Sequence, residues 1–589
     1  MKFWKIFLAC LLGSFVAMIL YVVFMFFSFG VLLSSLSPSA PAIKDNSVLK
    51  ITLSEDIPDR TNENPFVNFD FATFKTSQVV GLNDILKCLE KAKTDEKIKG
   101  IFLDVSSVPA GMATLEEIRN ALIEFKETGK FIISYSDAYT QKSYYLASVA
   151  DKIYLNPQGG LDWRGMYAQV TFFKGTLEKM GIEVQVFRHG KFKSAIEPFL
   201  LDKMSEENKL QTLTYVSSIW NHMLTGISVK RNITVADLNL YADSLMIFDA
   251  KSALQYKFVD KLVYRDEVLT EIKTKASYSD KDEDYLVSLG TYSKIPVKAK
   301  KEKYSENRIA VIFAEGSIVD GDGKDDEIGG DRLAAEIRKA REDEKVKAVV
   351  LRVNSPGGSG LASEIILHEM ELTKAVKPVV VSMGNYAASG GYYIACKASY
   401  IFAQPNTLTG SIGVFGLLPN MQKLLTDKIG LSFDGVGTNA HSDMGSITRP
   451  VTTQEGMVIQ KQIEDFYSVF INHVAQGRSM TVAEVDSIGQ GRVWSGENAL
   501  QIGLVDEIGG LDKAVKKAVE LAKLTDYRIK ELPEVKDFFE TMMSDFSNQM
   551  EQSYIKKNLG EDYRYIEMLQ YVKNASGVQA RIPYQIDVY

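Results

Sequence analysis

Two short segments place residues that do chemistry among small or apolar neighbours. The segment GNYAASGGYYIA at 384–395 contains Ser389, and a serine is a nucleophile only when a base takes its proton. No histidine lies in that segment. The segment HGKFKSAIEPF at 189–199 carries Lys191 and Lys193 in an otherwise apolar context. A lysine becomes a base when burial lowers its pKa from about 10.4.

Glycine pairs stand beside the serine and at the end of an earlier strand-like run. NSPGGSG at 354–360 follows a β-branched segment, and AASGG ends at 391. Backbone amides stabilise a developing oxyanion only where no side chain blocks close approach. PGG alone is most simply a turn. Two such glycine turns at strand ends of one sheet predict two converging amide donors.

An internal repeat runs through most of the chain. TDEKIKGIFLDVSS at 94–107 aligns with EDEKVKAVVLRVNS at 342–355, an offset of 248 residues, and the same offset aligns 131–157 with 379–405 without a gap. Register held over that distance indicates a duplicated domain. We therefore expect five parts: an anchor at 1–45, a first repeat at 46–295, a linker at 296–307, a second repeat at 308–525, and a helical tail at 526–589.

The two repeats have lost complementary residues. At the repeat offset, Ser389 faces Gln141, so the first repeat lacks the serine. Lys193 faces His441, so the second repeat lacks the lysine. This pattern predicts one working site built across both halves, with Lys193 as the base. His441 is the rival base.

Each half alternates short β-branched runs with amphipathic helical patterns. AVVLRVNS at 348–355 and PVVVSMG at 378–384 have the pattern of buried parallel strands. RLAAEIRKARE at 332–342 and ASEIILHEMELTKA at 362–375 have the pattern of the intervening helices. Strands alternating with helices predict an α/β fold with mostly parallel sheets.

The composition argues against several classes of protein. The 589 residues are 46% apolar and 24% charged, and a net charge of -7 argues against general nucleic-acid binding. Three cysteines do not make a disulfide framework. Without a CxxC pattern or a histidine pair at helical spacing, we predict no metal and no cofactor.

The N-terminus predicts a membrane anchor. Residues 6–33 are uncharged and apolar and follow Lys2 and Lys5. As a helix this run spans about 42 Å, which exceeds a hydrocarbon core of about 30 Å. A cleaved signal peptide has an apolar region of only about 7–15 residues, so we expect an uncleaved transmembrane helix. The lysines on its short side predict that the rest of the chain lies across the membrane from the cytoplasm.

From the anchor to about residue 525, these motifs resemble signal peptide peptidase A in its long, duplicated bacterial form. That family is a membrane-anchored relative of the Clp protease and crotonase fold. FKSAIEPF resembles the family's lysine motif and NYAASGGYYIA its nucleophile motif, which implies a dyad of Lys193 and Ser389. TGSIGV at 409–414 resembles a third motif, which implies that Ser411 orients the lysine. By similarity to the Clp arrangement, the oxyanion donors are the amides of Gly358 and Gly390.

The resemblance also implies a substrate, a location and an assembly. The enzyme would degrade cleaved signal peptides and other apolar, unfolded peptides on the extracytoplasmic face of the bacterial inner membrane. It would assemble as a bowl-shaped homo-oligomer, most simply a homotetramer, with lipid contacts through the N-terminal helix. Two alternatives stay open: a non-catalytic scaffold of the same fold, and a crotonase-type acyl-thioester enzyme. The sequence also leaves open whether Lys193 and Ser389 pair within one chain or between chains.

Overall fold

A computed structural model of the chain gives the architecture that positions these residues. The structure describes residues 2–36, 43–61, 69–70, 75–76, 79–278, 285–295, 305–534, 578–582 and 587–588.

The first half of the chain forms a six-stranded sheet. Its order is β10-β1-β4-β5-β6-β9, and all neighbouring strands are parallel. The central strands are almost entirely buried, as expected for a parallel sheet covered on both faces. The strands are β1 (Ser47–Ile51), β4 (Ile98–Asp104), β5 (Phe131–Tyr139), β6 (Lys152–Leu161), β9 (Lys261–Leu262) and β10 (Leu286–Ser288).

The second half repeats this order in an eight-stranded sheet. The path β22-β11-β14-β16-β17-β21 is parallel throughout, and a branch adds β18 and then β20 beside β16. The shared strand order confirms the predicted parallel α/β fold. The strands are β11 (Arg308–Glu315), β14 (Val346–Ser355), β16 (Val379–Ala388), β17 (Tyr400–Ala403), β18 (Leu408–Gly410), β20 (Val493–Ser495), β21 (Glu507–Ile508) and β22 (Arg528–Leu532).

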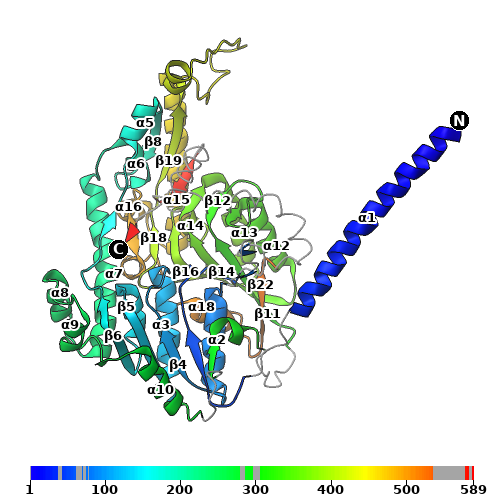
Figure 1. Cartoon of the computed structure of the whole chain (residues 1–589). Helices are drawn as coiled ribbons and strands as arrows, with labels where there is room; N and C mark the ends of the chain where they lie inside the picture. Colours follow the sequence, from blue (N-terminus) through cyan, green and yellow to red (C-terminus); the bar gives the residue numbers. More distant parts are fainter. Residues whose placement is uncertain are drawn as a thin grey trace.

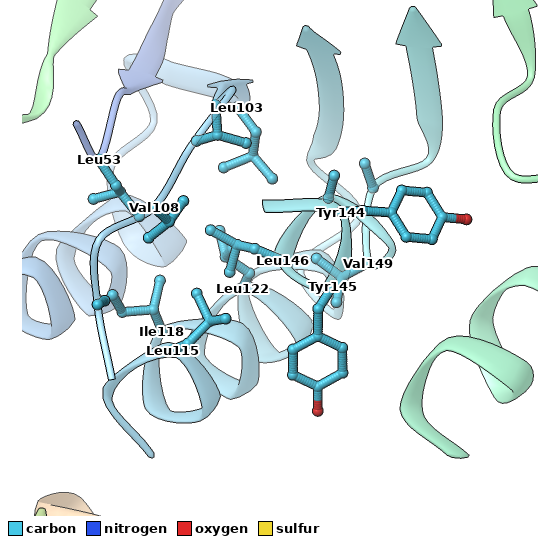
Figure 2. Packing of buried hydrophobic residues seen from close by; sticks show 14 of the residues in the cluster. Leu53, Leu103, Val108, Leu115, Ile118, Leu122, Tyr144, Tyr145, Leu146 and Val149 are labelled. Carbon is cyan, nitrogen blue, oxygen red and sulfur yellow. The ribbon is translucent and has the colours of Figure 1, made fainter. Parts of the chain in front are cut away.

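Helices cover both sheets because each has one apolar face. In α3, Leu115, Ile118 and Leu122 are fully buried, and Figure 2 shows them facing Val108 and the helix that carries Tyr145. The first-half helices are α2 (Leu82–Thr94), α3 (Met112–Lys126), α4 (Gln141–Ala147), α5 (Lys174–Met180), α6 (Glu197–Leu200), α7 (Glu206–Arg231), α8 (Val235–Asp243), α9 (Ala250–Gln255), α10 (Arg265–Lys275) and α11 (Leu289–Ser293). The second-half helices are α12 (Gly330–Glu342), α13 (Gly360–Lys374), α14 (Gly390–Tyr393), α15 (Thr453–Arg478), α16 (Val482–Ile488), α17 (Gly496–Gln501) and α18 (Leu511–Leu521).

A tyrosine–glutamate–histidine cluster occurs in both halves. In the first half, Tyr145 donates to Glu116 at 2.6 Å, and a His222 ring nitrogen lies 3.3 Å from the same carboxylate. In the second half, Tyr393, Glu364 and His473 form the same contacts. Tyr145 and Tyr393, like Glu116 and Glu364, are one repeat offset apart. Side-chain contacts that recur at one offset support the duplication.

A third sheet joins the two halves. Its order is β13-β12-β15-β23-β19-β8, and β8 (Glu183–His189) of the first half pairs antiparallel with β19 (Val414–Asn420) of the second. Figure 1 shows β8 and β19 side by side above the main sheets. The pairing brings the segment after His189 to the second half. The remaining strands are β12 (Ser317–Val319), β13 (Glu327–Gly329), β15 (Gly357–Ser359) and β23 (Gln579–Arg581).

The structure describes the predicted anchor segment but not most of the predicted linker. Helix α1 (Lys2–Leu36) covers the predicted apolar run and lies apart from the sheets (Figure 1). No helix in the part of the chain that the structure describes is both long enough and apolar enough to cross a membrane. Most of the predicted linker, residues 296–304, lies outside the described residues.

The tail predicted to be helical at 526–589 is described only in part, and those parts are strands. They are β22, β23 and β24 (Asp587–Val588), and β24 pairs with β7 (Ala168–Gln169). Residues 535–577 lie outside the described residues. The second unit therefore extends past 525, because β22 pairs with β11 over five residues.

Candidate active site

Ser389 stands at a sharp turn between a strand and a helix. It follows β16 directly and caps α14, with φ 55° and ψ −113°. A positive φ is rare for a residue with a side chain and persists only where neighbouring structure holds it. Here the Ser389 amide donates to Gly410 O at 2.8 Å, and its carbonyl accepts from Tyr393 N at 2.7 Å. The turn fixes the hydroxyl relative to the sheet.

Lys193 lies in the crossing loop that leaves β8. Gly190 has φ +97°, a left-handed conformation that suits glycine, and a Cβ there would lie 2.4 Å from Gln490 O. The Phe192 amide then donates to Gln490 O at 3.0 Å. A 3-10 turn at Ser194–Ile196 follows Lys193. The loop is thus held against the second half, and its lysine points into that half.

The two residues meet in the interior of the protein. Lys193 Nζ lies 2.7 Å from Ser389 Oγ, although the residues are 196 positions apart in the chain. Lys193 is 1% exposed and Ser389 is fully buried. The structure therefore brings together within one chain the pair that the sequence predicted.

Burial changes the chemistry of the lysine. The pKa of Lys193 is well below its usual value, and desolvation of the charged form is the cause. Its Nζ lies 5.9 Å from the centroid of the Phe415 ring, so part of its surroundings is apolar. An uncharged amine within hydrogen-bond distance of a hydroxyl has the geometry of a base beside a nucleophile.

Ser411 also contacts the amine of Lys193. Its Oγ is 3.2 Å and its backbone oxygen 3.3 Å from Lys193 Nζ. Ser411 has φ 49°, and its hydroxyl donates to Gly491 O at 3.3 Å. The predicted contact between Ser411 and the lysine is present in the structure.

The two predicted oxyanion glycines approach each other. A Cβ on Gly390 would lie 3.1 Å from the Gly358 amide nitrogen and 2.8 Å from Ser363 Oγ. A Cβ on Gly358 would lie only 1.9 Å from Ile318 O, so no side chain fits there. Gly358 needs glycine because of close backbone approach, whereas the nearest atom at Gly390 is the end of the Ser363 side chain. The structure places Gly358 and Gly390 together, beside Ser389.

The sequence prediction missed three neighbours of this site. Gly413 O accepts from Ser389 Oγ at 3.3 Å. A Cβ on Gly491 would lie 2.6 Å from Lys193 Cα, so this glycine lets the lysine loop pack. Gln211 Nε2 donates to Ser194 Oγ at 2.9 Å, and Gln211 Oε1 accepts from Val493 N. Gly413 in TGSIGV and Gly491 in GQGR are a weak sequence signal for a place in the site. Gln211, a glutamine on a helix, gives no such signal.

The counterparts in the repeat have other roles. Gln141 Nε2 donates to Gly165 O at 2.9 Å, and its Oε1 accepts from the Arg164 and Gly165 amides. Glutamine therefore ties a loop where the other half carries the serine. The imidazole of His441 contacts Glu455 Oε1 at 3.0 Å and Gln454 Oε1 at 3.3 Å in an exposed region.

A buried serine beside a buried amine, with two closely packed glycines beside it, defines the site of a serine hydrolase. The sequence matches peptidase family S49 over residues 124–279 and 371–525, together more than half of the chain. The first match contains Lys193 and the second contains Ser389 and Ser411. The chain belongs to peptidase family S49 and is a serine peptidase.

Relatives align with both halves. Protease 4 of Salmonella typhi is 40% identical over 460 residues, which cover 76% of this chain and 73% of that protein. Protease 4 of Haemophilus influenzae is 40% identical, covering 74% of this chain and 72% of that protein. The chloroplastic serine protease SPPA of Arabidopsis thaliana is 31% identical, covering 82% and 70%. The predicted resemblance to the long, duplicated form of signal peptide peptidase A is confirmed.

A solved ClpP1 structure from Listeria monocytogenes covers 35% of this chain and 94% of that one. Its identity of 14% and TM-score of 0.24 are too low to support an inference.

Proposed function

We propose that this protein is a membrane-bound endopeptidase that uses a Ser389–Lys193 dyad to degrade cleaved signal peptides. The 2.7 Å approach of Lys193 Nζ to Ser389 Oγ in a buried site carries the proposal. Family membership supplies the reaction class, and the geometry supports the choice of these two side chains within it.

In the proposed mechanism, neutral Lys193 accepts the hydroxyl proton as Ser389 Oγ attacks the peptide carbonyl carbon. Ser411 holds the amine through its hydroxyl and its backbone oxygen. The amine then protonates the leaving nitrogen and the C–N bond breaks, which leaves an ester on Ser389. Lys193 next takes a proton from water, and the hydroxide formed hydrolyses the ester. No cofactor or metal takes part in this scheme.

The Gly358 and Gly390 amides stabilise the negative oxygen of the tetrahedral intermediate. Each lost donor of this kind costs about 10²–10³ in kcat in serine hydrolases. Because Gly358 excludes a side chain and Gly390 carries none, no Cβ at these positions obstructs the reacting carbonyl.

The location and assembly belong to the same proposal. In this proposal the apolar run at 6–33 anchors the chain in the bacterial inner membrane, with the N-terminus in the cytoplasm and the catalytic part outside it. The chains form a homotetramer whose sites take apolar, unfolded peptides. Support comes from the apolar run at 6–33 and its flanking lysines.

The test is hydrolysis of a fluorogenic apolar peptide and of a synthetic signal peptide by the full-length protein in detergent. We expect Ser389→Ala and Lys193→Met to lose at least about 10³-fold in kcat. The matched control His441→Ala, at the rival base, should keep full activity. Circular dichroism and size-exclusion chromatography check that each variant is folded.

Other results would redirect the assignment. Full activity in Lys193→Met together with loss in His441→Ala would replace the dyad by a serine–histidine pair. An inactive, well-folded wild-type oligomer would favour the scaffold alternative. Cleavage of short apolar peptides without cleavage of signal peptides would retain the chemistry and reject the substrate.

A further inference from the structure

A buried glutamine joins the loop that carries the lysine to the other half of the chain. Gln211 lies on α7, and its side chain is 1% exposed. Its amide contacts the loop at 190–194, which we call the lysine loop, and β20 of the second half. The proposed proton transfer does not involve this residue, yet its contacts flank Lys193 on both sides.

The amide nitrogen of Gln211 holds the lysine loop at the two neighbours of Lys193. Nε2 donates to Phe192 O at 3.1 Å and to Ser194 Oγ at 2.9 Å. A group that fixes both neighbours also fixes the Cα of the lysine between them and the direction in which its side chain leaves the backbone. Because Gln211 stands on a helix of 26 residues, the hold comes from a rigid element.

The oxygen of the same amide is fixed by the second half. Gln211 Oε1 accepts from Val493 N on β20 at 3.1 Å. A backbone N–H only donates and a backbone carbonyl only accepts, so the two ends of the amide are not interchangeable here. The next residue on this backbone, Arg492, accepts from the Ser411 amide at 2.7 Å through its carbonyl. Gln211 therefore couples the lysine loop to the backbone that holds Ser411.

A buried polar network keeps Gln211 in this orientation. Its Nε2 lies 3.2 Å from Asn208 Oδ1, less than one turn earlier on α7. Asn208 Nδ2 in turn donates at 2.9 Å to the Glu197 carboxylate, which is 2% exposed and also accepts from the Ser205 amide and hydroxyl. Since buried amides that are paired at both ends have one favourable orientation, the network presents a fixed donor to the lysine loop.

The second repeat shows that the helix does not need this glutamine in order to form. Helices α7 and α15 each have 26 residues, and each ends at a residue with φ 54°, Asn232 and Ser479. Aligned on these ends, Gln211 faces Val458, which is 48% exposed. The helix is common to both copies, whereas the buried glutamine belongs to the copy that carries Lys193.

We propose that Gln211 is a positioning residue for the hydrolytic reaction, which sets the lysine loop so that Lys193 Nζ reaches Ser389 Oγ. Gln211 acts through the lysine and not on the peptide. This inference rests on the proposed function for the role of Lys193 as the base. A displacement of about 1 Å in a reacting group can cost about 10²-fold in rate, so the hold on both sides of the lysine matters for catalysis.

The first test compares two contacts that join the same helix to the same strand. Gln211→Met removes the amide and keeps a side chain of similar length. Ser218→Ala is the control, because Ser218 Oγ lies 2.8 Å from Ser495 Oγ of β20 and stands about two turns further along α7. With a fluorogenic apolar peptide and the full-length protein in detergent, we expect kcat of Gln211→Met to fall about 10- to 100-fold with little change in KM. Ser218→Ala should keep the wild-type kcat.

The second test uses Gln211→Glu, which keeps the size of the side chain. In its protonated form the new carboxyl group still accepts from Val493 N and donates one hydrogen to the lysine loop. In its ionised form it only accepts, so it repels Phe192 O and pushes the loop away. Burial raises the pKa of a carboxyl group, so ionisation should come at neutral to alkaline pH.

The pH profile of Gln211→Glu should therefore differ in shape from that of the wild type. Activity should fall at alkaline pH, where the wild type stays on its plateau and Ser218→Ala follows the wild type. The ionisable side chains around the lysine loop are Lys193 itself, Glu197 in the network, and Arg492, whose guanidinium lies 5.0 Å from the centroid of the Phe192 ring. All three are present in the wild type, so a new falling limb belongs to the substitution.

Labelling of Ser389 by a fluorophosphonate, with Ser389→Ala as the blank, separates the possible failures. A wild-type protein that neither hydrolyses the peptide nor takes the label would overturn the proposed function and this inference with it. If the wild type is active and Lys193→Met is not, a wild-type kcat in Gln211→Met, or equal losses in Gln211→Met and Ser218→Ala, would overturn the positioning role alone. If Gln211→Met does not fold, the pH profile of Gln211→Glu decides, and a profile of wild-type shape would reject the inference.

Discussion

The guanidinium of Arg352 donates to Asp59 Oδ1 at 2.9 Å, and the two residues come from different halves of the chain. The same guanidinium lies 2.7 Å from Glu117 Oε1, and all three side chains are at most 3% exposed. Arg352 stands on β14 and Glu117 on α3, so the contact joins a central strand of one repeat to a helix of the other.

Arg352→Met should strongly destabilise the protein. It leaves two buried carboxylates without their counter-charge, a loss that typically costs about 3–5 kcal/mol. Thermal unfolding followed by circular dichroism measures the effect. Lys461→Met is the control, because the Lys461–Asp465 pair is exposed and i,i+4 on a helix. Equal melting temperatures for the two variants would show that the buried cluster does not hold the halves together.

Lys193→Met should abolish activity and yet raise the melting temperature at pH 7. Because the folded-state pKa of Lys193 is lowered, the unfolded chain binds more protons between that value and about 10.4. Wild-type stability therefore rises with pH across this window, and the methionine variant lacks that rise. We expect a gain of about 1 kcal/mol or more at pH 7 that shrinks toward pH 10. A pH-independent loss of stability would contradict the neutral buried amine.

The rate should depend on pH through the same amine. Since kcat/KM reports groups of the free enzyme, activity toward a peptide without ionisable groups should rise with pH and reach a plateau. The midpoint should lie well below 10.4, as the lowered pKa of Lys193 requires. A midpoint near 10.4 would mean that the lysine is solvated in the working enzyme.

Gly390→Ala should reduce kcat by about 10²-fold or more while leaving the fold intact. The new methyl group would meet Ser363 Oγ at 2.8 Å, which a side-chain rotation relieves, and would approach the Gly358 amide nitrogen at 3.1 Å. Steady-state kinetics with circular dichroism separates lost catalysis from lost structure. Gly160→Ala in the first half is the control, since its Cβ meets nothing within 4 Å. Unchanged kcat in Gly390→Ala would contradict the requirement for an unobstructed approach at this position.

Ser411→Ala tests a positioning residue. The variant keeps the backbone oxygen near Lys193 Nζ and removes the hydroxyl at 3.2 Å. We expect kcat to fall about 10- to 100-fold with little change in KM, because a misplaced amine slows proton transfer without weakening binding. The acid limb of the pH profile should also move. A change in KM alone would assign Ser411 to substrate binding.

The duplication made much of this protein predictable. Because the chain contains two copies of one pattern, the two copies can be compared. Gln141 stands where the other half has Ser389, and His441 stands where the other half has Lys193. The pair of Ser389 and Lys193 could therefore be predicted from the sequence. Gln211 and Gly491 could not be found that way, since their roles depend on which loops meet in space. The strands at 528–532 and 579–581 were missed because a short strand carries little periodicity, and its partners lie far away in the sequence.

The pairing of β8 with β19 has a consequence for the timing of synthesis. The base is translated 196 residues before the nucleophile, which at about 5–20 residues per second is a delay of roughly 10–40 s. During that interval the emerging chain has an amine but no serine to activate. Because the proposed base and nucleophile lie in different halves, the growing chain has no complete dyad until both halves have been made.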